Sequence, residues 1–201
     1  MGVKWQTKVN KTSQRETMLQ GLKGKKVKVG SLADGGKMAW LASIHENGAN
    51  ITAGKAEYLT VPVHPEAAGR KASSFNDLFC IKSKKGNLLL VKQDGEGVIP
   101  YYWLTKSVKI PARKFLSNGH DLNVEKVIKQ TERLIPLVMD GKMSIDNMLD
   151  ECGRQLSTAI KNYMGETQAN SPITTAVKGS DTPLTGKTGA LVNSITWEVE
   201  G

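Results

Sequence analysis

The sequence predicts an α+β fold, in which a mainly antiparallel sheet packs against two long helices and long loops connect the elements. The first observation is the order of the expected elements, which is helix, strands, helices, strand. A doubly wound parallel sheet would instead alternate strands with helices along the chain. The second observation is the amphipathic pattern at residues 144–164, which is typical of a long helix with one buried face.

The first part of the chain predicts short elements. Residues 10–22 can form a short helix, and "KKVKVG" alternates between polar and apolar residues like a strand. "GGKMAWLASIHENGA" has helical periodicity, and Gly48 stands where a helix C-cap favours glycine. "AEYLTVPVHP" predicts a strand, and Pro62 indicates a sheet edge or a strand end because proline cannot donate a ladder hydrogen bond.

The middle of the chain predicts most of the sheet. "LFCIKS", the turn "KKG" and "NLLLVKQ" are typical of a β-hairpin. After a second turn, "DGEG", the segment "VIPYYWLTKSVKIP" is rich in aromatic and β-branched residues. These residue types favour strands, so this segment is the strongest strand prediction in the chain.

Two helices are expected next. Residues 121 to about 135 carry an apolar stripe, with Asp121 as the expected N-cap and Pro136 ending or kinking the helix. Residues 144–164 begin at Ser144 and place their apolar side chains on one face.

The sequence divides into two expected parts. Residues 1–30 are a basic N-terminal segment of one helix and one strand, joined to the body. Residues 31–201 form a single α+β domain that contains a long loop at residues 165–190, rich in Ser, Thr, Gly and Pro. The last strand, "ALVNSITWEVE", closes the chain.

Positive charge is concentrated at the N-terminal end. The formal net charge is +9, and the first 30 residues hold eight basic side chains against Glu16 alone. Such a patch can meet nucleic acid or an acidic protein surface, or it can be a solvated face. With Trp5 as its only aromatic residue, the patch predicts non-specific phosphate contact at most. The basic residues are Lys4, Lys8, Lys11, Arg15, Lys23, Lys25, Lys26 and Lys28.

Two short motifs that suggest cofactor or metal chemistry do not meet their own requirements. The tripeptide "GKT" at residues 186–188 ends like a phosphate-binding loop, but Asp181 stands where that motif needs a glycine. The following "ALVNSITWEV" also alternates like a strand, whereas the motif opens a helix. His45-Glu46 lacks the second histidine of a zincin, because position 49 is alanine.

The sequence indicates no catalytic site, cofactor or metal. Cys80 and Cys152 lie among apolar neighbours, so they are expected to be buried free thiols. A small hydrolase that uses one of them lacks a partner constellation. No apolar run is long enough to span a membrane, and the N-terminal residues lack the apolar run of a secretory signal.

Three stretches in this order resemble the tail-completion, or virion-morphogenesis, family of tailed bacteriophages. They are "MAWLASIHENGANI" (residues 38–51), "VKIPARKFL" (108–116) and "NSPITTAVKGSDTPLTGKTGALVNSITWEV" (170–199). Asn47 departs from the aromatic residue usual there, and Lys114 from a common proline. The matching residues are Ile44, His45, Glu46, Gly48, Ile110, Pro111, Ala112, Arg113, Phe115, Thr174, Lys178, Gly179, Pro183, Leu184, Thr188, Gly189, Leu191, Ser194 and Ile195.

The resemblance implies a structural protein of the phage neck, made in the bacterial host cytoplasm and located in the virion. It implies a ring of copies, with sixfold symmetry, that completes the tail end and meets the head connector or stopper and the tail-tube or tail-terminator proteins. Contact with packaged DNA is a further possibility, and membrane contact is not expected. The alternative is a non-specific DNA-binding module that uses the basic N-terminal segment.

Two further hypotheses concern the residues of these stretches. Arg113 is expected to pair with a carboxylate such as Glu46 and to fix the corner between strand and helix. The polar loop at residues 165–190 is expected to extend to a neighbouring copy. Its candidate contact residues are Thr174, Lys178, Gly179, Pro183, Leu184 and Gly189.

Overall fold

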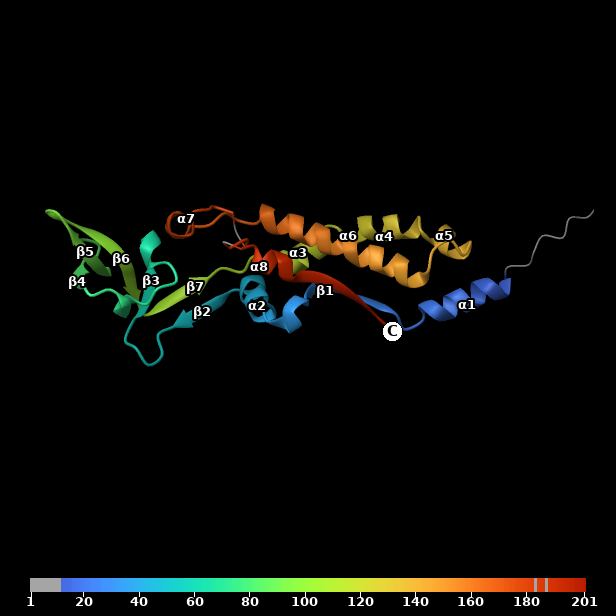
Figure 1. Ribbon diagram of the computed structural model, residues 1–201, viewed down its shortest axis with the longest axis horizontal. Helices are drawn as coiled ribbons and strands as arrows, with labels where there is room; N and C mark the ends of the chain where they lie inside the picture. The colour runs from blue at the N-terminus through green and yellow to red at the C-terminus, as the bar shows by residue number, and fades with distance from the viewer. Residues whose placement is uncertain (1–11, 183, 187) are drawn as a thin grey trace, which may run out of the picture.

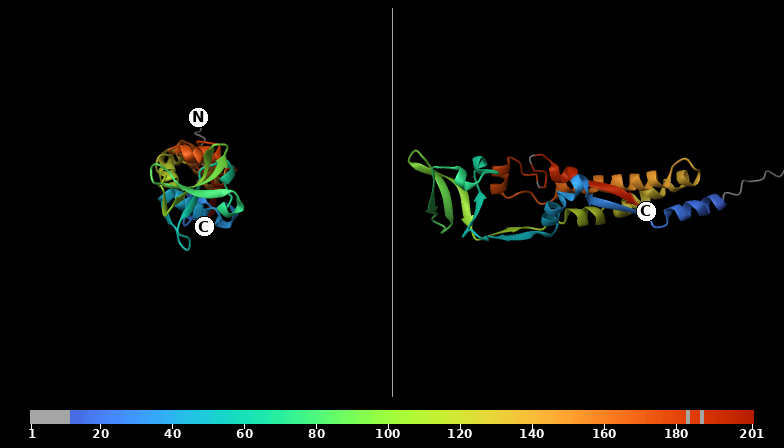
Figure 2. Two further views of the ribbon diagram at one scale, coloured as in Figure 1. Left: turned by 90° about the vertical axis from the view of Figure 1, so that its left-hand side faces the viewer. Right: turned by 60° about the horizontal axis from the view of Figure 1, so that its bottom comes forward.

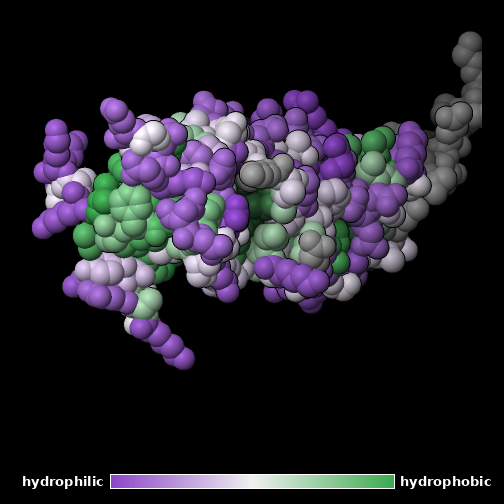
Figure 3. Space-filling model, turned by 60° about the vertical axis from the view of Figure 1, so that its left-hand side comes forward, coloured by the Kyte–Doolittle hydropathy of each residue, from purple (hydrophilic) through white to green (hydrophobic). Residues whose placement is uncertain are grey.

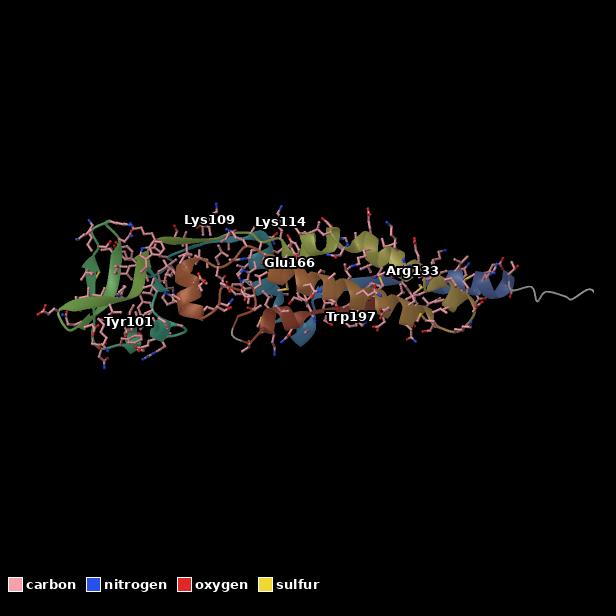
Figure 4. The ribbon with its side chains drawn as sticks, turned by 90° about the horizontal axis from the view of Figure 1, so that it is seen from above. Tyr101, Lys109, Lys114, Arg133, Glu166 and Trp197 are labelled. Atoms are coloured by element: carbon pink, nitrogen blue, oxygen red, sulfur yellow. The ribbon has the colours of Figure 1, made fainter. Side chains whose placement is uncertain are left out.

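The computed structural model describes residues 12–182, 184–186 and 188–201 of the chain. The fold is α+β, and every strand pairing among these residues is antiparallel, as the sequence predicts. The molecule is elongated, with a helical end and a sheet end joined by a two-stranded ribbon (Figure 1). Figure 4 places Tyr101 in the sheet end and Trp197 in the helical end.

The long helix α6 (Ile145–Glu166) organises the helical end. Ser144 caps it, since its side-chain oxygen accepts a hydrogen bond from the backbone N–H of Asn147 at 3.1 Å. The strands β1 (Lys26–Ser31) and β8 (Ile195–Glu200) form an antiparallel ribbon that packs on this helix. The main hydrophobic core lies between them and contains Ala42, Phe115, Ile160, Met164, Leu184, Leu191 and Ile195.

Close contact between α6 and β8 depends on one glycine. A Cβ atom at Gly153 would lie 2.4 Å from Cδ1 of Trp197, well inside van der Waals contact. The indole N–H of Trp197 also donates to Asp150 at 2.8 Å, which fixes the ring over the helix. Gly153 is therefore a packing residue in the interior of a helix, where glycine otherwise costs stability.

The predicted helix over residues 121–135 is wrong in its bounds, and the described residues form one long helix instead of two. Asp121 ends a first helix instead of capping the next, and Asn123 donates through its side chain to the carbonyl of Gly119 at 2.9 Å. Pro136 lies in the first turn of a later helix, where its missing N–H costs nothing. The three short helices are α3 (Phe115–Asp121), α4 (Val124–Glu132) and α5 (Ile135–Met139).

The remaining helices of this end are short. They are α1 (Thr12–Leu22), the 3₁₀ helix η1 (Ala33–Gly36), α2 (Ala39–Asn47) and α8 (Ala190–Ser194). The α8 segment was expected to be part of the last strand, and it forms one helical turn before β8. Leu191 and Ser194 point from this turn into the core, which explains why a short helical turn is favoured there.

The sheet end contains four antiparallel strands in the order β3-β6-β5-β4. The hairpin predicted from "LFCIKS" and "NLLLVKQ" is confirmed, and so is the strand predicted from "VIPYYWLTKSVKIP", which breaks at Lys106. The strands are β3 (Leu59–Pro62), β4 (Leu78–Lys82), β5 (Leu88–Asp94) and β6 (Gly97–Thr105).

One face of this sheet packs on its own small core. A register shift beside Leu90 lets Tyr101 and Tyr102, neighbours in sequence, both reach that core. The 3₁₀ helices η2 (Pro65–Ala67) and η3 (Ala72–Ser74) cover this face. Cys80 on the edge strand β4 is exposed, so the prediction that this thiol is buried is wrong; both cysteines are free.

The strands β2 (Ala49–Thr52) and β7 (Ser107–Ile110) form the ribbon that joins the two ends (Figure 1). The predicted loop at residues 165–190 contains a short helix, α7 (Pro172–Lys178), which contacts η2 of the sheet end. Figure 2 shows α7 beside the sheet end, so this segment runs from the helical end toward the sheet.

We expect Gly153→Ala to destabilise the protein by about 1–3 kcal/mol, because the added methyl group overpacks against Trp197. Urea denaturation followed by circular dichroism measures the change.

The matched control is Gly165→Ala on the same helix, where an added Cβ meets no atom within 4 Å. This substitution should be neutral or stabilising by up to about 1 kcal/mol, because alanine favours helix. Equal effects at the two positions would contradict the packing role of Gly153.

Candidate functional site

The three motif stretches meet at the corner where the ribbon joins the helical end. The carboxylate of Glu46, at the end of α2, accepts hydrogen bonds from the backbone N–H of Leu116 at 2.8 Å and of Ser117 at 3.0 Å. The Ser117 hydroxyl donates to the same carboxylate. Glu46 thus satisfies the free amides at the N-terminal turn of α3, where the helix dipole also favours a negative charge.

The predicted pairing of Arg113 with Glu46 is wrong. Among the described residues, no ion pair joins these side chains, since Glu46 is held by the amides of α3. The corner is fixed instead through the backbone: the N–H of Arg113 donates to the carbonyl of His45 at 2.8 Å, and that of Lys114 to the carbonyl of Glu46 at 3.3 Å.

Gly48 has a steric role at this corner. It is the C-cap of α2, as predicted, with φ +74°. A Cβ atom here would lie 2.8 Å from the backbone N of Ala112 and from the carbonyl oxygen of Ile110. The strand β7 therefore approaches the end of α2 more closely than any side chain allows. Of the other predicted motif residues, Phe115 is fully buried in the main core and Pro111 is exposed.

Arg113 and His45 lie together on the inner side of the corner. Nη1 of Arg113 is 3.4 Å from Nδ1 of His45, and Nε of Arg113 is buried without a hydrogen-bond partner among the described residues. Burial lowers the pKa of His45, and the positive charges of Arg113 and Lys178 lower it further. The imidazole is therefore biased toward its neutral form.

Lys178, at the end of α7, completes this group of basic side chains. Its ammonium group donates to the carbonyl oxygen of Thr182, and Thr185 Oγ1 lies 3.5 Å away. Burial lowers the pKa of Lys178, and the charge of Arg113 lowers it further, whereas Asp181 acts in the opposite direction.

A hollow of about 270 Å³ lies between these side chains. His45 comes from the first motif stretch, Arg113 from the second, and Lys178 and Leu184 from the third. A larger hollow of about 470 Å³ lies between α4 and α6, but none of the predicted site residues lines it. The corner is therefore the place where the structure brings the predicted residues together.

The third stretch is folded against its own chain. Asn170 donates through its side chain to the carbonyls of Ser180 at 3.3 Å and Thr182 at 3.1 Å. Gly179 adopts φ +78° after α7, and Gly189 adopts φ +66° before α8. Leu184 is buried in the main core at φ +59°, an unusual conformation for leucine.

The outcome for the predicted inter-subunit residues is mixed. Thr174 is exposed, Lys178 and Gly189 line or flank the hollow, and Pro183 lies outside the described residues. Contact with a neighbouring copy stays a prediction. Sequence reasoning missed Asn170, whose amide closes the loop; its position just before a Ser-Pro helix start was the available signal.

The predicted basic patch is only partly described. Lys4, Lys8 and Lys11 lie outside the described residues. Lys25 pairs with Asp146 at 2.7 Å, and Lys28 pairs with Glu200. These two acids offset part of the positive charge; the other described basic residues of the patch, Arg15, Lys23 and Lys26, are exposed.

Among the described residues, no group of three or more His, Cys, Asp or Glu side chains is placed to hold a metal ion. No helix formed by these residues combines the length and apolar character needed to cross a membrane.

We expect Glu46→Ala to destabilise the protein by about 1–2 kcal/mol, because α3 then loses the acceptor at its N-terminal turn. Chemical denaturation measures this loss. Glu166→Ala is the control, since Glu166 is exposed at the end of α6 (Figure 4) and should change stability by less than about 0.5 kcal/mol. A loss at Glu46 no larger than that of the control would refute the capping role.

Comparison with protein-family models, with curated proteins and with solved structures finds no match to this chain.

Proposed function

We propose that this protein is a structural subunit of a phage neck, which completes the tail end and joins it to the head connector as one copy in a ring. It does so without catalysis, through surface contacts. Two things support the proposal: the resemblance of the three motif stretches, and an apolar sheet face that the described part of the chain leaves partly exposed.

The partly exposed sheet face is the observation that carries the proposal. Val91, which the register places on this face, is fully buried, so the exposure lies in the side chains around it. Strand pairing sets Val61, Trp103, Leu89 and Ile81 in one row across all four strands. This row lies on the face opposite to Tyr102 and Leu90, which pack on the small core beneath η2 and η3. None of the four belongs to either buried cluster, and all are only partly buried.

The same face continues toward the edge strand and the hairpin tip. Phe79 is 42% exposed and Val98 is 43% exposed. Figure 3 shows apolar side chains gathered on the surface at the sheet end, bordered by polar ones. Exposed apolar patches bordered in this way mark protein interaction sites in soluble proteins.

Exposed apolar side chains also lie at the other end of the molecule. Leu122 is 70% exposed between α3 and α4, and Ile128 and Ile135 are 49% and 46% exposed on α4 and α5. A ring closes by heterologous contacts, which need two different surfaces on one subunit. Figure 1 places α4 and α5 at the opposite end of the molecule from the sheet, so the two sets of exposed side chains are separate.

We expect Phe79→Lys to prevent assembly while leaving the fold intact. The variant removes an aromatic ring from the contact and buries a charged side chain there. Because aromatic residues carry much of the binding energy of interfaces, the affinity of each contact between subunits should fall by about tenfold or more. The assay is complementation of a phage in which this gene is disrupted, with electron microscopy of the particles and a count of infectious titre.

The matched control is Lys84→Gln in the exposed turn of the hairpin, which should restore assembly like the wild-type chain. Thermal melting shows whether both variants fold. Heads and tails that join normally without the gene would overturn the neck function, whereas full rescue by Phe79→Lys would overturn only the role of the sheet face.

A further inference from the structure

The hollow at the corner holds more positive charge than the described residues around it neutralise. Arg113 and Lys178 both line it, and each lowers the pKa of the neighbouring His45. Of the nearby carboxylates, Glu46 is held by the amides of α3, and Asp181 is exposed. Among the described residues, neither Arg113 nor Lys178 forms an ion pair.

The donors of these side chains are incompletely used. Nε of Arg113 is buried and has no acceptor among the described residues, although a buried guanidinium N–H normally finds one. Nη1 of the same group faces the ring nitrogen of His45 at a long 3.4 Å. Lys178 donates to the carbonyl of Thr182 and to Thr185 Oγ1, which leaves one N–H of its ammonium group for another acceptor.

The rest of the lining is mixed. Thr188 adds a hydroxyl group, and Leu41, Leu184 and Leu191 are apolar. The side-chain donors of Asn170 and Thr185, which also line the hollow, are already used in bonds to carbonyls of their own loop. At about 270 Å³, the hollow is smaller than the pockets that hold drug-sized ligands. A single side-chain head group or a free ion matches this space better than a nucleotide.

We propose that this hollow is a binding site for one oxyanion, a carboxylate or a phosphate, held between Arg113 and Lys178. A guanidinium and an ammonium group are the donors that proteins use for these anions, and the guanidinium can offer two parallel N–H bonds. A bound anion separates the two like charges with an opposite one.

The proposal also gives a direction for the pH dependence of binding. The groups that face His45 are Arg113 and Lys178, with Glu46 next in sequence and Asp181 beside Lys178. The two cations disfavour a protonated His45, and a bound anion favours it. Affinity for the anion should therefore rise as the pH falls through the pKa of His45, and it should fall as the pH rises.

The inference does not depend on the neck function, because the charged lining is a property of the isolated chain. The two sources of an oxyanion, a protein side chain and free phosphate, share this chemistry. The experiment therefore titrates the full chain with inorganic phosphate in one arm and with glutarate, a dicarboxylate, in the other, at constant ionic strength set with sodium chloride.

Two readouts apply to each titration. Isothermal calorimetry gives the affinity, and the ¹H–¹⁵N signal of the Arg113 Nε–H reports on the guanidinium group that the anion is expected to contact. Arg113→Lys identifies that signal by its loss. We expect binding of at least one anion, with a shift of the Nε–H signal that saturates in the same titration.

The variants are Lys178→Gln and Arg113→Gln, with Lys109→Gln on the exposed face of β7 as the matched control (Figure 4). Loss of one charged hydrogen bond should weaken binding by about tenfold or more in the first two and leave it unchanged in the control. Thermal melting without anion shows whether each variant folds. If one of the two variants does not fold, the other still tests the site.

The outcomes separate clearly. Phosphate binding alone assigns the site to a free or esterified phosphate, and glutarate binding alone assigns it to a protein carboxylate; either supports the proposal. No binding of either anion at 10 mM or so, binding that Lys109→Gln weakens as much as Lys178→Gln, or an unmoved Nε–H signal overturns it.

Discussion

The hold of the Glu46 carboxylate on the first turn of α3 is the constraint on which the corner depends. The backbone N–H groups of Leu116 and Ser117 both donate hydrogen bonds to this carboxylate, and these bonds connect the end of α2 to the start of α3. The chain reaches α3 directly from the ribbon, so this contact also sets how the sheet end leaves the helical end. Gly48 makes the same corner possible sterically, since no side chain fits between α2 and β7.

The motif residues therefore divide into two groups with different physical roles. Glu46, Gly48 and Phe115 build the corner and the core, and a substitution at any of them acts through stability. Arg113 and Lys178 contribute charge to a hollow without an ion-pair partner among the described residues, which is a costly arrangement for stability alone. Such a cost points to a binding role, which we have proposed for an oxyanion.

The two ends of the molecule serve the proposed assembly in different ways. The helical end has a core of its own around α6, and in it the first strand of the chain, β1, pairs with the last strand, β8. The sheet end has only a small core on one face and leaves an apolar row on the other. A four-stranded sheet with one face packed is stable enough to keep its shape, and the free face is available for a neighbour.

The sequence by itself determined the α+β class, the hairpin, the strand over β6 and β7, and the helix that starts at Ser144, because alternation, helical periodicity and capping are local signals. Only the tertiary structure decided the rest. At the break after Asp121, the Asn123 side chain bonds back to Gly119, and Cys80, on the edge strand β4, is exposed. The backbone amides of α3 compete with Arg113 for the Glu46 carboxylate, and they reach it only when α3 docks against α2. Arg113 therefore lines the hollow with His45 and Lys178 instead of pairing with Glu46. Residues 45, 113 and 178 lie far apart in the chain, and local sequence patterns do not report which distant residues come together in the folded protein.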